Sequence, residues 1–389
     1  MKIAKILGTA ALVSTLGVQA YAAPGAKDVL TTYADIAHAG YEDSLITAKK
    51  LQSAIDALIA QPSAETFGAA KSAWLAARVP YQQTEVYRFG NAIVDDWEGK
   101  VNAWPLDEGL IDYVETGLYG EESEENPAYT ANVIANPSLN ISGTTIDALI
   151  IDAALLEDLH EIDDVESNVA TGYHAIEFLL WGQDLHGTDA GAGERKWTDY
   201  ASGDACTNGN CDRRGEYLQA AADLMVSDLE WMTAQWADGG EARETVLEGD
   251  GVPGLTAIVT GMGSLSYGEL GGERTKLGLL LHDPEEEHDC FSDNTHNSHY
   301  YDALGIQNVY LGRYTRVDGS VVEGPSLSDL VAANDAALDT ELRAKLAASV
   351  VAGKVMVTRA QGGEAFDQLI AMGNEDGNAV VQSFVDALV

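Results

Sequence analysis

The sequence predicts an all-α protein. Apolar residues recur at helical spacing along most of the chain, as they do from Lys27 to Ala60, whereas the alternating pattern of strands is scarce. The best strand candidate, from Val317 to Val322, is short enough to be a hairpin or a loop. The simplest all-α arrangement is antiparallel helical bundles.

The length predicts two domains. About 365 residues remain after an N-terminal leader, which is more than one hydrophobic core usually holds. The loop from Gly187 to Asp212 is a natural boundary. We therefore expect a signal peptide over residues 1–22, an N-terminal helical domain over 23–200 and a C-terminal helical bundle over 201–389.

The expected helices follow from apolar periodicity, from Pro62 as a stop and from Pro80 as a bend. They cover residues 27–60, 65–89, 146–159, 165–181, 213–236, 255–281, a helix that begins near 296, 326–352, 355–372 and a short last helix to 389. The segment 255–281 is rich in glycine, which indicates close backbone approach to another helix or to a ligand.

The N-terminus has the pattern of a secretory signal peptide. Lys2 and Lys5 precede an apolar run from Ile6 to Val18, and the small-residue site Ala20-Tyr21-Ala22 follows. The apolar run is too short to span a bilayer, and no other segment is long and apolar enough. We expect export without a transmembrane segment, to the periplasm or to an outer-membrane or cell-surface location.

The chain is strongly acidic. Its formal net charge is −40, which becomes −42 without Lys2 and Lys5. Nucleic acid is excluded as a partner, because phosphate binding needs clustered Lys and Arg. Most of the acidic residues are explained by a solvated surface suited to a salty medium. Carboxylates are also the ligands that hard cations prefer.

His174 and Glu177 lie one turn apart on the apolar face of a short hydrophobic helix. A buried carboxylate without a partner costs several kcal/mol, so a shared proton, a cation or a metal must compensate it. The pair is either a mutually satisfied core His/Glu pair or part of a metal or catalytic site.

The three cysteines suggest one local disulfide. Cys206 and Cys211 flank the turn-rich Thr-Asn-Gly-Asn, and in an exported protein this spacing favours a disulfide over a two-thiolate metal site. Cys290 is left over, and burial is its favoured interpretation.

The segment from His282 to His299 is the densest in potential ligands. It is either a second cation site or an acidic loop with capping residues, in which Asp293 or Thr295 caps the helix that begins near His296.

Four blocks in this order resemble the imelysin-like family, and more narrowly its iron-regulated protein A branch, which is related to insulin-cleaving metalloproteinases. They are Gly172-Tyr173-His174-Ala175-Ile176-Glu177, the segment Trp74 to Glu85, Glu273-Arg274, and Glu287 to His296. The resemblance covers nearly the whole mature chain. It implies two helical-bundle domains with a site at their interface, export, and a link to iron acquisition.

The resemblance also implies site residues. His174 and Glu177 belong to the site, and the matching blocks add Arg78, Glu85, Asp293 and His296. We predict a metal site formed by His174, Glu177 and Glu85, in which Arg78 holds a carboxylate, and in which Glu273, Asp293 and His296 are the alternative ligands.

The predicted function is metal binding for iron uptake, with a divalent or trivalent ion as ligand and iron favoured over zinc. A membrane iron transporter or a surface partner would receive the ion. Two alternatives stay open: a metallopeptidase, and a non-catalytic module for a peptide, a glycan or haem. The peptidase alternative lacks the second histidine of the His-Glu-x-x-His helix and of its inverse, since Phe178 follows Glu177.

Overall fold

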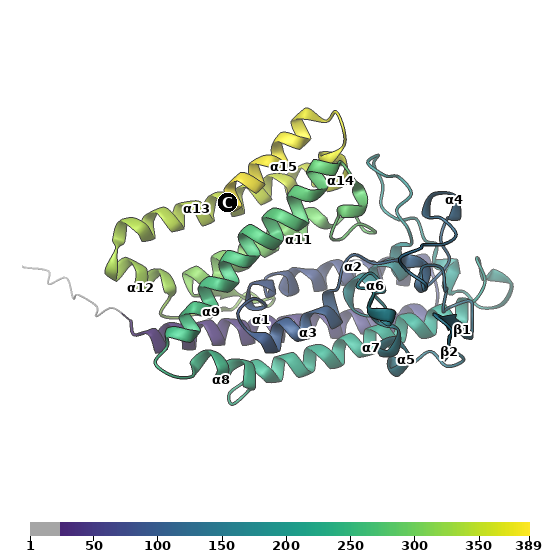
Figure 1. Cartoon of the computed structure of the whole chain (residues 1–389), viewed down its shortest axis with the longest axis horizontal. Helices are drawn as coiled ribbons and strands as arrows, with labels where there is room; N and C mark the ends of the chain where they lie inside the picture. The colour runs from purple at the N-terminus through teal and green to yellow at the C-terminus, as the bar shows by residue number, and fades with distance from the viewer. Residues whose placement is uncertain (1–23) are drawn as a thin grey trace, which may run out of the picture.

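The computed structural model describes residues 24–389, in which helices joined by loops are accompanied by two short strand pairs, and this confirms the all-α prediction. The predicted signal peptide lies outside these residues. Long helices from the first half of the chain run side by side, and the C-terminal helices pack along one side of them (Figure 1). No helix among residues 24–389 is both long and apolar enough to cross a membrane.

The first half contains these helices and strands: α1 (Ala26–Ala60), α2 (Ala64–Gln82), η1 (Glu85–Tyr87), α3 (Ala92–Asn102), η2 (Glu108–Leu110), α4 (Thr116–Tyr119), β1 (Ser138–Ile141), β2 (Thr144–Asp147), α5 (Ala153–Leu159), η3 (Ile162–Asp164) and α6 (Gly172–Trp181). The second half contains η4 (Trp197–Tyr200), η5 (Gly203–Ala205), α7 (Cys211–Trp236), α8 (Glu241–Leu247), α9 (Val252–Gly263), the π-helix η6 (Ser264–Leu277), α10 (Gly278–Leu281), η7 (Pro284–Glu286), α11 (Thr295–Leu311), β3 (Arg313–Thr315), β4 (Val321–Glu323), α12 (Leu327–Asn334), α13 (Ala336–Gln361), α14 (Phe366–Ile370) and α15 (Glu375–Leu388). Each strand pair is a short antiparallel hairpin.

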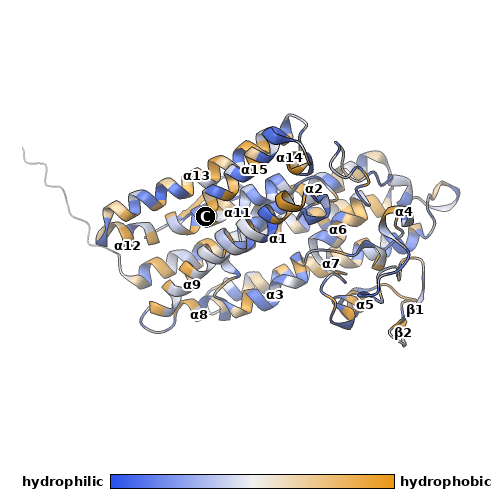
Figure 2. Ribbon diagram, turned by 45° about the horizontal axis from the view of Figure 1, so that its top comes forward, coloured by the Kyte–Doolittle hydropathy of each residue, from blue (hydrophilic) through white to orange (hydrophobic). Residues whose placement is uncertain are grey.

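The long helices are amphipathic, and hydrophobic and hydrophilic residues alternate around them (Figure 2). Helix α1 buries an apolar stripe against α2 and α7, and Tyr41, Tyr87 and Trp236 meet in the core between these elements. Since α7 lies beyond residue 200 yet packs along α1, the helices on the two sides of the predicted boundary share a core. The division of the chain into two domains at residues 200 and 201 stays a prediction.

Several predicted helix bounds are wrong, and local backbone chemistry explains each case. Ile146 lies in β2 because Ser142 and Gly143, both with positive φ, form a two-residue hairpin turn. The helix expected over 326–352 is two helices because Asp335 caps the start of α13 by accepting from two backbone N–H groups. Helix α13 then continues through the predicted start of a helix at residue 355 and ends before Gly362 and Gly363.

Two further bounds affect the site. The helix expected over 65–89 ends at Gln82, two residues after Pro80, and a 3-10 turn carries Glu85. The helix expected over 165–181 begins only at Gly172, and all ten of its residues are buried. Three hydrogen bonds fix its first turn: Trp74 Nε1 donates to the carbonyl oxygen of Tyr173 (2.9 Å), Thr171 Oγ1 to that of Lys100 (2.8 Å) and Tyr217 OH to that of Ala170 (2.8 Å).

Gly172 is the residue that lets α6 begin against α3. Its φ is +78°, and a Cβ at this position would lie 2.4 Å from the carbonyl oxygen of Val101. We expect Gly172→Ala to lower the free energy of unfolding by about 3 kcal/mol or more, because both the backbone conformation and the contact are lost. The control is Gly68→Ala in α2, where an added Cβ meets nothing within 4 Å, so a gain of about 0.5–1 kcal/mol is expected. Urea denaturation measures both, and equal effects would contradict the packing argument.

His299 of α11 makes stability depend on pH. Its ring lies 5.1 Å from that of Phe366 and is stacked at 6.4 Å on that of Phe384, and burial, reinforced by Arg274, lowers its pKa to about 3. Below about pH 6.5 the unfolded chain therefore binds a proton at this histidine, whereas the folded chain does not. The free energy of unfolding therefore decreases as the pH falls from about 6.5 toward 3. We expect His299→Gln to reduce the slope of unfolding free energy against pH by about 1.4 kcal/mol per pH unit in this range. Urea titrations between about pH 6 and pH 4 test this, and an unchanged slope would count against a neutral His299.

Candidate metal centre

His174 and Glu177 contact each other, as their spacing on a helix predicts. Nδ1 of His174 lies 3.1 Å from Oε2 of Glu177, and the two residues are 1% and 0% exposed. The other carboxylate oxygen of Glu177 accepts two hydrogen bonds from Ser292, one from the backbone N (3.0 Å) and one from Oγ (2.6 Å). Helix α6 is therefore fastened to the segment that precedes α11.

That segment adds His288 and Asp289 to the pair. The rings of His174 and His288 meet edge to face with centroids 4.8 Å apart. His174, His288 and Asp289 each offer one ligand atom, and these atoms all lie within 4.8 Å of one another. We call His174, Glu177, His288 and Asp289 the histidine cluster.

Arg78 of α2 holds the carboxylate of Asp289. Its Nη2 donates to Oδ1 (2.6 Å) and its Nε to Oδ2 (3.3 Å), while its Nη1 donates to Oδ1 of Asn102 (2.6 Å). Nη2 also lies 3.4 Å from Nδ1 of His288, and the guanidinium lies 5.0 Å from the centre of the Tyr173 ring. Arg78 thus joins α2, α3, α6 and the segment before α11 at one buried point.

Both imidazoles of the cluster are neutral. Burial, reinforced by Arg78, lowers the pKa of His174 to about 3, and burial together with Arg274 lowers that of His288 well below its usual value. Burial alone would raise the pKa of Asp289, but Arg78 holds it at about 2, so this carboxylate is ionised. Burial and the charge of Asp289 raise the pKa of Glu177 well above its usual range.

The donor set suits a metal ion. Nε2 of His174 and Nε2 of His288 are both buried, and neither has a hydrogen-bond partner among residues 24–389. A neutral imidazole has one nitrogen with a lone pair that can bind a metal, and the partner of the opposite nitrogen orients the ring, as Glu177 does for His174. On Asp289, Oδ2 also accepts from Asn294 and Ser298, whereas within residues 24–389 Oδ1 accepts from Arg78 alone and has a second lone pair for an ion. Two nitrogens and one oxygen can therefore converge on an ion.

The other predicted residues lie outside this cluster. Glu85 is buried and pairs with Arg274 (2.8 Å), which also binds Glu269 and Asp302. Glu273 is exposed on η6, beside the buried Arg274. The ligand role predicted for these two glutamates is not supported by a contact with His174.

Asp293 and His296 flank the N-terminus of α11. The helix begins at Thr295 with Asn294 as its N-cap, so neither Asp293 nor Thr295 occupies the cap position that the sequence suggested. Each has a buried atom without a hydrogen-bond partner in the described part of the chain, Oδ1 of Asp293 and Nδ1 of His296.

A cavity of about 590 Å³ reaches the edge of the histidine cluster. Trp104, Glu108, Asp184, Glu285 and Cys290 are among its lining residues. The ring of Trp104 meets the ring of His288 edge on at 5.8 Å between centroids, and its Nε1 donates to the carbonyl oxygen of Glu287 (2.7 Å). Trp104 therefore both lines this acidic cavity and contacts the cluster.

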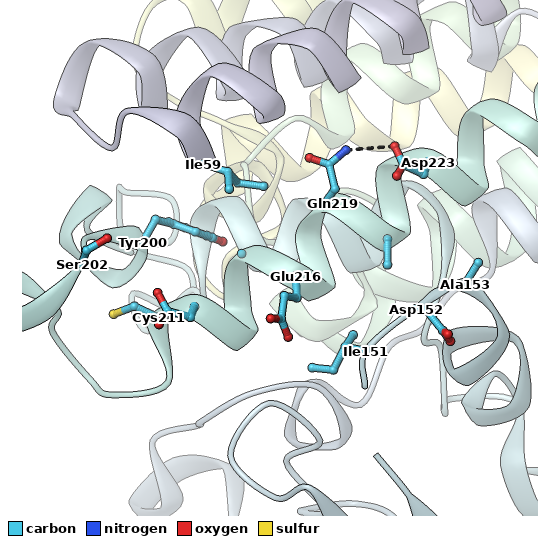
Figure 3. A pocket seen from close by; sticks show the side chains of 13 residues that line it. Ile59, Ile151, Asp152, Ala153, Tyr200, Ser202, Cys211, Glu216, Gln219 and Asp223 are labelled. Atoms are coloured by element: carbon cyan, nitrogen blue, oxygen red, sulfur yellow. Dashed lines mark hydrogen bonds between the residues drawn. The ribbon is translucent and has the colours of Figure 1, made fainter. Parts of the chain in front are cut away.

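A second cavity, of about 530 Å³, lies along α7 (Figure 3). Its lining includes Ile59, Tyr200 and Glu216, and Gln219 donates to Asp223 on its wall. None of the histidine cluster lines it, so it carries no part of the proposed chemistry.

The predicted disulfide between Cys206 and Cys211 is confirmed, with Cα atoms 6.0 Å apart. Cys290 is a free thiol, only partly covered, and it lines the cavity beside Trp104.

Comparison with known proteins agrees with this fold. A protein assigned as an iron-regulated protein A precursor from Parabacteroides distasonis is 17% identical, with 95% of each chain covered and a TM-score of 0.64. An imelysin-like protein from Psychrobacter arcticum is 16% identical, with 95% of this chain and 92% of that chain covered and a TM-score of 0.61. No curated protein matches the sequence. The family model for Imelysin matches residues 37–389, and the chain therefore belongs to the imelysin family.

Proposed function

We propose that this protein is an exported metal-binding protein that serves iron uptake and holds its ion at the histidine cluster. The observation that carries the proposal is the convergence of one ligand atom each from the buried His174, His288 and Asp289 within 4.8 Å, together with Nε2 atoms of both histidines that have no partner in the described part of the chain. A buried ring nitrogen without a partner is costly, and an ion bound by His174, His288 and Asp289 would compensate for burying these polar groups.

The parts of the cluster have separate tasks in this proposal. His174, His288 and Asp289 supply the ligand atoms, and Glu177 accepts a hydrogen bond from Nδ1–H of His174 so that Nε2 faces the ion. Arg78 keeps Asp289 ionised and fixes its position. The acidic cavity beside Trp104 would concentrate cations next to the cluster.

Imidazole and carboxylate ligands suit Fe, Mn, Zn and Cu alike, so the ligand atoms do not select the metal. Iron is favoured because of a similar protein. The similar protein from Parabacteroides distasonis is named for regulation by iron. The predicted signal peptide supports export to the periplasm or the cell surface, where a membrane iron transporter or a surface partner would receive the ion.

The metallopeptidase alternative faces a geometric difficulty. A hydrolytic ion needs an open position for water and substrate, whereas His174, His288 and Asp289 are each 1% exposed or less. The glutamate nearest the imidazoles, Glu177, is engaged through both of its oxygens. A peptide bond could reach the cluster only after the segment carrying Ser292 has moved away.

The metal assignment is tested by elemental analysis after equilibration with a limiting mixture of Fe, Mn, Zn and Cu. The wild-type protein is expected to retain about one equivalent, mainly of iron, and His174→Ala is expected to lose it while keeping the helical circular dichroism spectrum. The matched control is His38→Ala, since His38 is a partly exposed histidine of α1 that lies outside the cluster. If His174→Ala retains metal as tightly as the wild type, the ion is bound elsewhere or not specifically.

Glu85→Gln distinguishes a ligand from a structural ion pair. Because the carboxylate pairs with the buried Arg274, we expect a loss of about 3–5 kcal/mol in unfolding free energy and no change in retained metal. Loss of metal in this variant would restore Glu85 to the ligand set that the sequence suggests. The control is Glu273→Gln on the exposed face of η6, which should change neither quantity.

A further inference from the structure

The cavity beside Trp104 borders the segment that carries half of the histidine cluster. Two residues of this segment, His288 and Asp289, belong to the cluster. Three residues on either side of them line the cavity, namely Glu285, Cys290 and Phe291. The cavity and the cluster therefore share one short stretch of chain.

Trp104 contacts both the cavity and this stretch. Its side chain lines the cavity, and its ring meets the ring of His288 edge on, with centroids 5.8 Å apart. Its Nε1 donates to the carbonyl oxygen of Glu287 (2.7 Å), the residue before His288. Since an indole has a single N–H donor, this is the only hydrogen bond that the side chain can donate.

Several side chains that contact the histidine cluster are buried. Those that bind the carboxylate of Asp289 are at most 4% exposed, namely Arg78, Asn294 and Ser298. Trp104 and Ser292, by contrast, are partly exposed. Ser292 donates two hydrogen bonds to a cluster carboxylate, whereas Trp104 is held by one. Trp104 is therefore the less restrained of the two.

The cavity is acidic. Its lining includes Asp107, Glu108, Asp184 and Glu285, and no lysine or arginine among residues 24–389 lines it. Burial raises the pKa of Glu108 to about 8, and the charge of Glu285 adds to that effect. A cavity lined in this way attracts cations and repels anions.

The cavity is also large enough for an ion with its hydration shell. Its volume is about 590 Å³. A water molecule occupies about 30 Å³ in the liquid, so an ion and its six or so waters fit without loss of the shell.

We propose that iron enters the histidine cluster from this cavity as a hydrated cation, and that the side chain of Trp104 is the gate between the two. Rotation of the indole breaks its hydrogen bond to Glu287 and uncovers the ring of His288. An anionic chelate is excluded, because the acids of the cavity repel it. The inference rests on the proposed metal site and adds the form in which the ion arrives.

Rates of iron exchange test the gate. The anaerobic uptake of aqueous Fe²⁺ and its loss to an excess of chelator are compared between the wild type and Trp104→Ala. Both rates should rise about tenfold or more in the variant, because a gate changes the barrier to exchange. Iron retained at equilibrium should stay the same, because the ligands are unchanged, and this shows that the variant is folded. The matched control is Trp231→Ala, which removes an exposed tryptophan of α7 and should leave both rates unchanged.

Two further variants locate the route. Trp104→Phe keeps an aromatic ring beside His288 and removes the N–H donor, so its rates should lie between those of the wild type and Trp104→Ala. Ser292→Ala tests the other partly exposed neighbour of the cluster. If exchange is faster in Ser292→Ala and unchanged in Trp104→Ala, the ion enters beside Ser292 and the proposal is overturned.

The form of the ion is tested with charge and with a chelate. Glu285→Gln should slow the uptake of aqueous Fe²⁺ at about 0.01 M salt, and the difference should shrink at about 0.5 M salt. Uptake from iron(II) nitrilotriacetate should slow as free nitrilotriacetate is added, because only the released ion enters. Initial rates that do not respond to free nitrilotriacetate would contradict entry as a hydrated cation.

Failure of the gate is distinguishable from failure of the metal site. If the wild type retains iron and Trp104→Ala exchanges it at the same rates as Trp231→Ala, the gate alone is overturned. If the wild type retains no iron, the proposed metal site is overturned, and this inference with it.

Discussion

The buried ion pair between Arg78 and Asp289 is the contact on which the centre of this protein depends. Arg78 comes from the middle of α2, and Asp289 lies far along the chain in the segment before α11. The same carboxylate accepts from Asn294 and Ser298, and the backbone N of Asp289 donates to Thr295 Oγ1 (2.9 Å), so the segment is wound around this acid. Removal of either partner would leave the other charge buried and unpaired, which would lower the free energy of unfolding by about 3–5 kcal/mol.

The ion pair also sets the charge state of the histidine cluster. The positive charge of Arg78 lowers the pKa of His174 beyond the effect of burial, so the imidazole keeps a lone pair. Burial, reinforced by the negative charge of Asp289, raises the pKa of Glu177, so this acid holds its proton more firmly than an exposed glutamate does. An ion at the histidine cluster would favour the ionised form of Glu177, and metal uptake would then be coupled to release of that proton.

The sequence predicts the local features of this protein well and the long-range features less well. The contact of His174 with Glu177 and the disulfide of Cys206 with Cys211 depend only on short spacing, and both are present. The glycine-rich segment also behaves as expected, since a Cβ on Gly261 would lie 2.3 Å from the carbonyl oxygen of Val86.

The partners His288 and Asp289 join His174 through tertiary packing, which no periodicity encodes.

Glu85 shows how one helix end changes a site prediction. A continuous helix through residue 89 would place Glu85 on the same face as Arg78, two turns further along. The helix ends at Gln82, and the 3-10 turn directs Glu85 toward Arg274 instead. The hairpin of β1 and β2 was not predicted for a similar reason. The two turn residues, Ser142 and Gly143, determine the local structure, although the apolar pattern after them is helical.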